Sequence, residues 1–282
     1  MAIDPKAVFA LKILAQVLAE DRRDVVLIGA TVPQVRVRPD HEGEFRGRPT
    51  LDVDAVVTAG SWEDYERIRR RLFEAGFRPG TAPHQLLFGE DVMIDLIPYG
   101  PALVQNDRLE WAETGRVIST LGMEEAFASA EQVEVAPGFS LRVVTIPGLV
   151  LLKIVAYQDR PEERARDLSD IVHCFEHYEE AIEGSRRFDL AGGTVDGEPV
   201  AFEEAGAYLL GIEVAGLARP RSLLAVTRFL DMIPDAYARP ISQLLSGERR
   251  FLNNESRRGE LFRLFRVFAA AIHEAAEGHP GT

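Results

Sequence analysis

The sequence of 282 residues has a single cysteine, Cys174, so no disulfide can form within the chain. A lone thiol is typical of proteins that work in a reducing cytoplasm. No stretch reaches the roughly 20 apolar residues of a membrane helix. Asp4, Lys6 and Lys12 interrupt the short apolar runs near the N-terminus, unlike a secretory signal. We therefore expect a cytoplasmic protein with no membrane span.

The chain also has fewer basic than acidic residues. Lys and Arg number 32 against 45 Asp and Glu, which gives a formal net charge of -13. A chain this acidic has no general electrostatic attraction for nucleic acid, so such a partner would need a local basic patch. Two arginine clusters qualify, and each is either an RNA surface or a solvated helix face. They comprise Arg67, Arg69, Arg70 and Arg71, and further along the chain Arg249, Arg250, Arg257, Arg258, Arg263 and Arg266.

Several catalytic signatures are missing. The sequence has no G-x-S-x-G nucleophile elbow, and Gly192-Gly193 lacks the spacing of a dinucleotide-binding or P-loop motif. His173 and His177 are four residues apart on a predicted helix, but neither an H-E-x-x-H pattern nor a third ligand accompanies them. The sequence therefore gives no support for chemistry based on these motifs.

The sequence does contain two carboxylates in a strand pattern. Leu51, Val53 and the apolar run 55–57 predict a strand, in which alternation places Asp52 and Asp54 on one face. Two neighbouring carboxylates repel each other unless a hard cation such as Mg²⁺ takes oxygens from both. A D-x-D pattern by itself is also common on a solvated strand face. On this motif alone, metal binding and solvent exposure are both open.

Small residues follow the preceding predicted strand, residues 25–28. The turn Gly29-Ala30-Thr31 leads to Pro33 at the start of a helix, where free backbone N–H groups can bind phosphate. An ordinary strand-to-helix corner would use the same residues. A polar loop then runs to Arg48, which precedes the carboxylate strand and is a candidate phosphate contact.

A third carboxylate lies in a predicted hairpin, residues 85–97. In its second strand the alternating apolar residues face one way and leave Asp95 on the other side. Burying a carboxylate in so apolar a strand is costly without a partner. A cation shared with Asp52 and Asp54 would provide one.

A predicted helix that begins at Pro147 carries one charge, Lys153, in an apolar run. This side chain either extends to the surface or faces an anion in a cleft. The next predicted helix carries Arg164, Asp167 and Asp170 about one turn apart, which an ion-pair ladder along the helix would explain. Beyond about residue 185 the patterns are helical and contain no chemical motif.

In this order, the motifs resemble the polymerase-β-type nucleotidyltransferase superfamily, and within it the nucleotidyltransferases related to AbiEii/AbiGii toxins. The resemblance implies an α+β (α/β) fold: a nucleotidyltransferase-type mixed β-sheet flanked by helices, followed by an α-helical C-terminal region. It implies a catalytic domain in residues 1–146 and a mainly helical domain in residues 147–282. The resemblance covers roughly residues 20–215, and its matches are Ile28-Gly29-Ala30-Thr31, Arg48-x-Thr50-x-Asp52-x-Asp54, Asp95-Leu96-Ile97-Pro98, Leu152-Lys153, Asp159-Arg160, Arg164, Asp167 and Asp170.

The resemblance also implies roles for single residues. Asp52, Asp54 and Asp95 would hold Mg²⁺ or Mn²⁺, and Asp95 would help to activate the attacking hydroxyl. Many members have Gly-Ser or Gly-Gly where this chain has Gly29-Ala30, so a serine hydroxyl contact to phosphate is absent here. The helical domain would contribute Lys153, which meets the triphosphate, with Asp167 and Asp170 as the last acidic motif. The expected nucleotide contacts are Gly29, Ala30, Thr31, Arg48, Thr50, Lys153 and Arg160.

The implied reaction is in-line attack of an acceptor hydroxyl on the α-phosphate of an NTP, with pyrophosphate leaving. We expect a toxin-like enzyme whose acceptor is RNA, such as tRNA, or a protein, and whose partner is an antitoxin. An acidic cleft would also suit a cationic aminoglycoside, as in an antibiotic nucleotidyltransferase. The remaining hypothesis is an inactive nucleotide-binding module that binds a partner, against which the presence of all three carboxylates argues.

Overall fold

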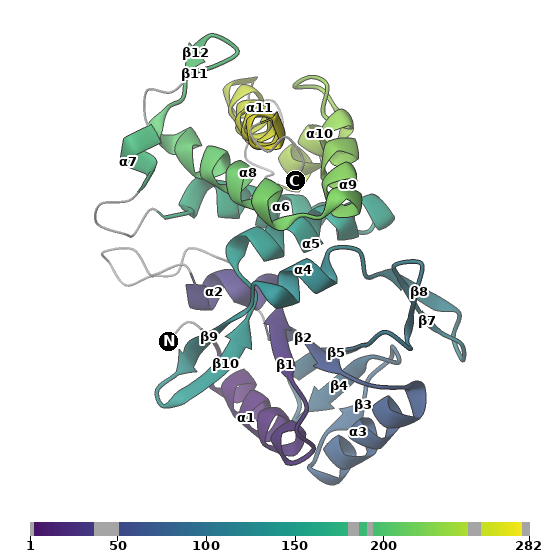
Figure 1. Ribbon diagram of the computed structural model, residues 1–282. Coiled ribbons are helices and arrows are strands. Elements are labelled where there is room, and N and C mark those ends of the chain that lie inside the picture. The colour runs from purple at the N-terminus through teal and green to yellow at the C-terminus, as the bar shows by residue number, and fades with distance from the viewer. Residues whose placement is uncertain (1–2, 37–50, 180–185, 191–193, 248–254, 278–282) are drawn as a thin grey trace. The chain divides into compact units, whose positions relative to one another are not determined.

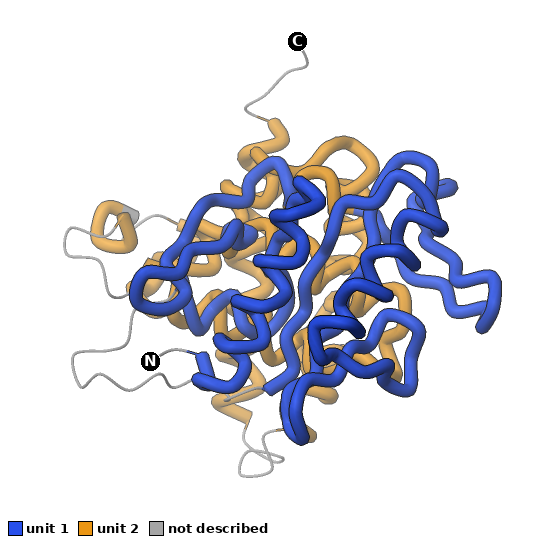
Figure 2. The backbone as a smooth tube through the Cα atoms, turned by 90° about the horizontal axis from the view of Figure 1, so that it is seen from below, with its two compact units in different colours: residues 1–121, 127–145 blue, residues 122–126, 146–282 orange. Residues whose placement is uncertain are grey.

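The computed structural model describes residues 3–36, 51–179, 186–190, 194–247 and 255–277. The chain forms two compact units (Figure 2). Unit 1 comprises residues 1–121 and 127–145, and unit 2 comprises residues 122–126 and 146–282. Most of helix α4 (Met123–Ala128) therefore belongs with the C-terminal half of the chain.

Unit 1 is built around a seven-stranded sheet with the strand order β3-β4-β5-β2-β1-β10-β9 (Figure 1). Strand β2 runs parallel to β5 and β1 runs parallel to β10, whereas the other neighbouring pairs are antiparallel. Parallel neighbours need a crossover connection, and α3 with the β3–β4 segment provides it between β2 and β5. The strands are β1 Val25–Ile28, β2 Asp52–Thr58, β3 Arg78–Pro79, β4 Gln85–Phe88, β5 Val92–Tyr99, β9 Glu131–Ala136 and β10 Phe139–Val143.

Helix α3 begins at a side-chain cap, because Ser61 Oγ accepts a hydrogen bond from the Asp64 N–H at 3.1 Å. The Tyr65 hydroxyl then donates to the Leu96 carbonyl of β5 at 2.6 Å and anchors the helix to the sheet. Burial raises the pKa of Tyr65, so the hydroxyl keeps this proton at neutral pH. The helices of unit 1 are α1 Pro5–Glu20, α2 Val32–Arg36 and α3 Trp62–Glu74, with a 3₁₀ turn η1 Gly29–Thr31.

A second, three-stranded sheet, for which the sequence motifs above give no prediction, lies between β5 and α4 in the chain. Its middle strand buries Trp111, whose ring contacts Trp62 of α3 with the ring centroids 5.7 Å apart. The small sheet is therefore tied to the main body of unit 1. Its strands are β6 Val104–Gln105, β7 Arg108–Trp111 and β8 Arg116–Ser119.

Unit 2 is mainly helical and has an aromatic core. Phe175 packs against Phe265 and Phe268 with ring centroids 5.4 and 4.9 Å away. Helices α8 and α11 pack so closely that a Cβ on Gly211 would lie only 2.6 Å from the Cβ of Ala271. Glycine, which has no Cβ, makes this approach possible. The elements are α5 Ile146–Asp159, α6 Ala165–His177, α7 Arg186–Leu190, β11 Thr194–Val195, β12 Glu198–Pro199, η2 Phe202–Glu204, α8 Ala205–Leu217, α9 Pro220–Asp231, α10 Arg239–Gly247 and α11 Glu255–Glu277.

The expected fold class is confirmed: a mixed sheet flanked by helices is followed by a helical C-terminal region. Within the described ranges, none of the helices combines the length and the apolar character needed to cross a membrane.

Candidate active site

Strand register brings two of the three predicted carboxylates side by side. In the parallel pair β2–β5, Asp54 is the partner of Asp95, and Asp52 is the partner of Met93. Register partners point to the same face, and neighbouring strands lie about 4.8 Å apart. Asp54 and Asp95 are therefore adjacent, with Asp52 one step further along the same face. The alternate positions on the opposite face are apolar and buried, as the sequence pattern predicted.

Asp95 is half-buried, and one of its oxygens is unpaired. Oδ1 is buried and has no hydrogen-bond donor among the described residues, while Oδ2 lies 3.5 Å from Nε2 of His84. His84 is itself 5% exposed. A buried carboxylate oxygen without a donor costs free energy, and a cation or a hydroxyl group bound beside Asp95 would remove that cost.

Gly29 makes room for Asp54. Ile28, the last residue of β1, pairs with Asp54, and the chain then turns with Gly29 at a φ of +76°. A Cβ at position 29 would lie 1.9 Å from Asp54 Oδ2, so glycine is needed both for the backbone conformation and for the close approach. Ala30 is the middle residue of this turn, and the hydroxyl of the buried Thr31 donates to the Ile28 carbonyl at 3.4 Å. The Thr31 hydroxyl therefore supports the turn itself.

The carboxylates fit Mg²⁺ as part of a shared coordination shell. In the portion of the chain described here, no three His, Cys, Asp or Glu side chains gather as a metal-binding group. Mg²⁺ commonly takes one or two protein carboxylates and completes its shell with water and substrate phosphates. The adjacent Asp54–Asp95 pair, with its unpaired buried oxygen, matches that pattern. Nucleotide phosphates would therefore complete such a site.

In unit 2, Lys153 of α5 is bound by two carboxylates of α6. Its Nζ donates to Asp167 Oδ1 at 2.8 Å and to Asp170 Oδ2 at 2.7 Å. Burial alone would lower the pKa of Lys153, but the two carboxylates outweigh burial and hold the pKa above its ordinary value of 10.5. The guanidinium of Arg164 lies further from Asp167, at 3.8 Å. Asp167 and Asp170 are thus paired with Lys153 of the neighbouring helix α5, and this contact is shorter than the one between Asp167 and Arg164 at the start of α6.

The predicted catalytic residues form two groups in the structure. Asp52, Asp54 and Asp95 belong to unit 1, whereas Lys153, Asp167 and Asp170 belong to unit 2. That the two groups share one cleft stays a prediction. Among the predicted nucleotide contacts, Arg160 follows α5 with its guanidinium 3.8 Å from Glu163, and Arg48 and Thr50 lie outside the described residues.

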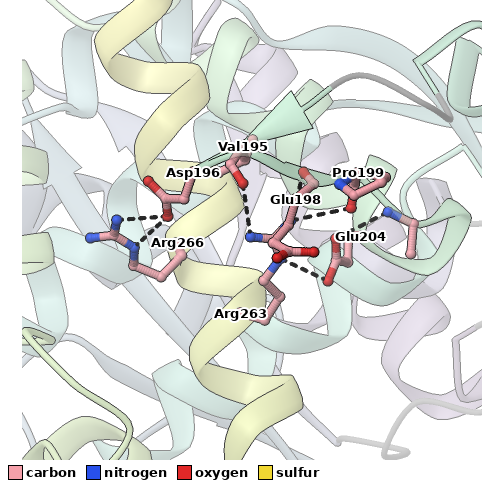
Figure 3. Close-up of polar contacts among 8 residues, drawn as sticks. Val195, Asp196, Glu198, Pro199, Glu204, Arg263 and Arg266 are labelled. Carbon is pink, nitrogen blue, oxygen red and sulfur yellow. Dashed lines mark hydrogen bonds and ion pairs between the residues drawn. The ribbon is translucent and has the colours of Figure 1, made fainter.

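The C-terminal arginine cluster is largely used inside unit 2. Arg263 of α11 pairs with Glu204 at 3.1 Å and donates to three carbonyls of the β11–β12 hairpin at 3.2 to 3.4 Å (Figure 3). Arg266, one turn further along α11, pairs with Asp196 of the hairpin at 2.7 Å. Arg257 pairs with Glu176 at 3.0 Å. These contacts favour a structural role for the cluster over an RNA surface.

Three of the four arginines of α3 are also engaged in ion pairs. Arg69 pairs with Glu66 at 2.8 Å, Arg67 pairs with Asp64, and Arg71 pairs with Glu20. The Arg67 pair is typical of a solvated helix face, whereas the side chain of Arg69 is only 14% exposed and packs over Tyr65 and Phe73. Arg249 and Arg250 of the C-terminal cluster lie outside the described residues.

Replacing Arg263 and Arg266 one at a time tests the structural role of the C-terminal arginine cluster. Arg263→Met should lower the free energy of unfolding by about 2 kcal/mol, because it removes a charged donor from several carbonyls. Arg266→Met is the matched control and should have little effect, since its ion pair with Asp196 is about half exposed. Urea unfolding measures both. Equal stability of the two variants would contradict the structural role of Arg263.

Comparison with protein families gives a match over residues 12–194, roughly two thirds of the chain. The matching family is described as nucleotidyl transferase AbiEii toxin of type IV toxin–antitoxin systems. The matched range includes both groups of predicted catalytic residues. None of the curated proteins matches the chain.

Two solved structures have limited similarity to this chain. An antigenic nucleotidyltransferase-like protein from Paracoccidioides brasiliensis is 15% identical, with a TM-score of 0.40 over 60% of this chain and 75% of that one. A proposed nucleotidyltransferase from H. pylori is 14% identical, with a TM-score of 0.38 over 96% of this chain and 98% of that one. Similarity at this level adds nothing to the assignment of the site. On the family match, the chain belongs to the AbiEii nucleotidyltransferase toxin family of type IV toxin–antitoxin systems.

Proposed function

We propose that this protein is a Mg²⁺-dependent nucleotidyltransferase of the cytoplasm. It transfers a nucleoside monophosphate from an NTP to a hydroxyl group of RNA or of a protein. The observation that carries the proposal is the register of β2 and β5, which sets Asp54 beside Asp95, while one buried Asp95 oxygen has no hydrogen-bond partner within the described ranges. The family supplies the reaction class, and its toxin–antitoxin context supplies an antitoxin as partner.

In this proposal the carboxylates of unit 1 organise the reacting groups. Asp54 and Asp95, with Asp52 beside them, would hold Mg²⁺, or Mn²⁺ in its place. The bound ion supplies positive charge that neutralises the phosphates during transfer. Asp95 orients the attacking acceptor hydroxyl. Backbone N–H groups of the Gly29–Thr31 turn, which abuts Asp54, bind phosphate without the serine hydroxyl found in many relatives.

The residues of unit 2 contribute a fixed positive charge. Lys153 binds the triphosphate, and its raised pKa keeps it protonated at neutral pH. Asp167 and Asp170 hold its ammonium group in place through two short hydrogen bonds. A charge that is positioned before the substrate arrives costs no reorganisation during the reaction. Arg48, Thr50 and Arg160 are the further proposed nucleotide contacts.

Nucleotide labelling tests this function. Purified protein is incubated with Mg²⁺, total cellular RNA and each α-³²P-labelled NTP in turn. We expect label to enter RNA or the protein with one preferred NTP, which identifies both the base and the acceptor class. Asp54→Asn should give no label, because the neutral amide lacks the negative charge with which a carboxylate binds a divalent cation. Asp231→Asn, which changes an exposed aspartate of α9, should label like the wild type.

Absence of label in both RNA and protein, with NTP still bound, would defeat the toxin-like form of the proposal. Transfer to an aminoglycoside in a parallel reaction would instead support an antibiotic nucleotidyltransferase. Nucleotide binding that survives Asp54→Asn and is unaffected by removal of Mg²⁺ would favour a binding module.

A further inference from the structure

His84 lies against Asp95 and has no part in the reaction outlined above. Its Nε2 is 3.5 Å from Asp95 Oδ2, and its side chain is only 6% exposed. Its Nδ1 is also buried and has no hydrogen-bond partner in the described part of the chain. Because Nε2 is the nitrogen with an acceptor within reach, we assign the ring proton to Nε2.

Contacts on several sides fix the imidazole ring. The Leu96 N–H donates to the His84 carbonyl at 2.8 Å, which ties the His84 backbone to the residue that follows Asp95. The ring packs on Trp111 with the two centroids 5.3 Å apart, and Trp111 in turn packs on Trp62. A side chain held in this way loses little further rotamer entropy when its Nε2–H binds the carboxylate.

We propose that His84 is a positioning residue for Asp95. Its Nε2–H holds Oδ2 of the carboxylate, so that Oδ1, which has no donor among the described residues, is left for the metal ion or the acceptor hydroxyl. This inference rests on the proposed function, because it needs Asp95 to act on one of those groups. The present separation exceeds the usual hydrogen-bond length of about 2.9 Å. Such contacts in free enzymes commonly tighten in the substrate complex.

Mn²⁺ binding followed by electron paramagnetic resonance tests the proposal on the full-length protein. His84→Leu removes the donor, whereas His84→Gln keeps an N–H donor at a similar distance along the side chain. We expect His84→Leu to weaken Mn²⁺ binding by about 10-fold to 100-fold, the usual effect of losing a group that orients a metal ligand. His84→Gln should retain most of the affinity. Thermal unfolding of each variant separates this effect from a general loss of structure.

A second variant covers the case in which His84→Leu does not fold. His84→Asn remains polar but is too short to reach Asp95 from the same backbone position, so it should weaken Mn²⁺ binding like His84→Leu. In the labelling reaction at saturating Mg²⁺, His84→Leu and His84→Asn should both lower kcat and leave the KM for NTP nearly unchanged. Loss of packing around the site would change both constants.

Wild-type affinity for Mn²⁺ in His84→Leu and His84→Asn would overturn the proposal, and so would an equal loss in His84→Gln. A wild-type protein that binds Mn²⁺ but transfers no nucleotide would defeat the proposed function alone. The Mn²⁺ comparison would then still decide the role of His84. A wild-type protein that binds no Mn²⁺, either alone or in the presence of NTP, would defeat both.

Discussion

Gly29→Ala is expected to lower nucleotide transfer by about 100-fold, the typical effect of moving a reacting group by 1 Å. The new methyl carbon would lie 1.9 Å from Asp54 Oδ2 and 2.7 Å from Asp54 Cβ. Since the Asp54 Cβ is fixed to the backbone of β2, rotation of the carboxylate alone cannot relieve the collision. The strand or the turn must move, and Asp54 then leaves its register position beside Asp95.

A matched control separates this collision from backbone strain. Gly29 has a φ of +76°, and Gly138 in the β9–β10 hairpin has a φ of +69°. A Cβ at Gly138 would meet nothing within 4 Å. Gly138→Ala should therefore carry the strain of a left-handed alanine, about 1–2 kcal/mol, and retain wild-type transfer. Initial rates of labelling and urea unfolding of both variants provide the comparison. Equal rates in the two variants would show that Asp54 does not need its present position.

The features of the candidate site that depend on short segments of the chain could be predicted from the sequence. Alternation along β2 and β5 has a period of two residues, so it showed which face Asp54 and Asp95 occupy before their pairing was known. The isolated positive charge of Lys153 in an apolar helix signalled a partner, since a lysine is rarely buried alone. These are properties of short segments, and a sequence contains them directly.

The pairing between segments could not be predicted in the same way. The register that sets Asp54 opposite Asp95 joins strands 41 residues apart, and no local pattern specifies it. His84 precedes the first strand of its hairpin and was missed, although the adjacent Gln85 pairs with Asp95. Regular alternation would place Gln85 rather than His84 on the face of Asp95, so the sequence pattern could not have found His84.

Element boundaries and the use of charge also depended on tertiary contacts. The helix predicted to begin at Pro147 begins one residue earlier, at Ile146. Arg263 was indistinguishable in sequence from a surface arginine, because its carbonyl partners lie in a hairpin more than 60 residues earlier. A charged residue acquires a structural or a binding role only through such distant partners.

Lys153→Met is expected to destabilise the protein by about 3–5 kcal/mol, the usual cost of leaving one partner of a buried ion pair without the other. The side chain of Asp167 is only 5% exposed, and that of Asp170 is 33% exposed, so water cannot fully replace the lost ammonium group. Lys6→Met is the matched control, because the Lys6–Asp91 pair has side chains that are 66% and 46% exposed. That variant should unfold at the same urea concentration as the wild type.

The stabilisation by Lys153 should depend on pH in one direction only. Folding raises the pKa of Lys153 above its ordinary value of 10.5, so the folded state binds this proton more tightly than the unfolded state. The contribution of Lys153 to the free energy of unfolding is therefore fully present below its pKa in the unfolded state. It is lost as pH rises through its pKa in the folded state. The stability difference between wild type and Lys153→Met should stay constant from pH 7 to about 10 and decrease above that.

Neutralising Asp167 and Asp170 should restore part of the stability that Lys153→Met removes. In the triple variant Lys153→Met/Asp167→Asn/Asp170→Asn no uncompensated carboxylate is left, so its stability should exceed that of Lys153→Met. If that variant is well folded but transfers no nucleotide, the group of Lys153, Asp167 and Asp170 contributes to the reaction beyond its part in stability. If Lys153→Met is instead as stable as the wild type, the aspartates do not depend on Lys153. Its ammonium group would then be as available to a triphosphate as that of a surface lysine.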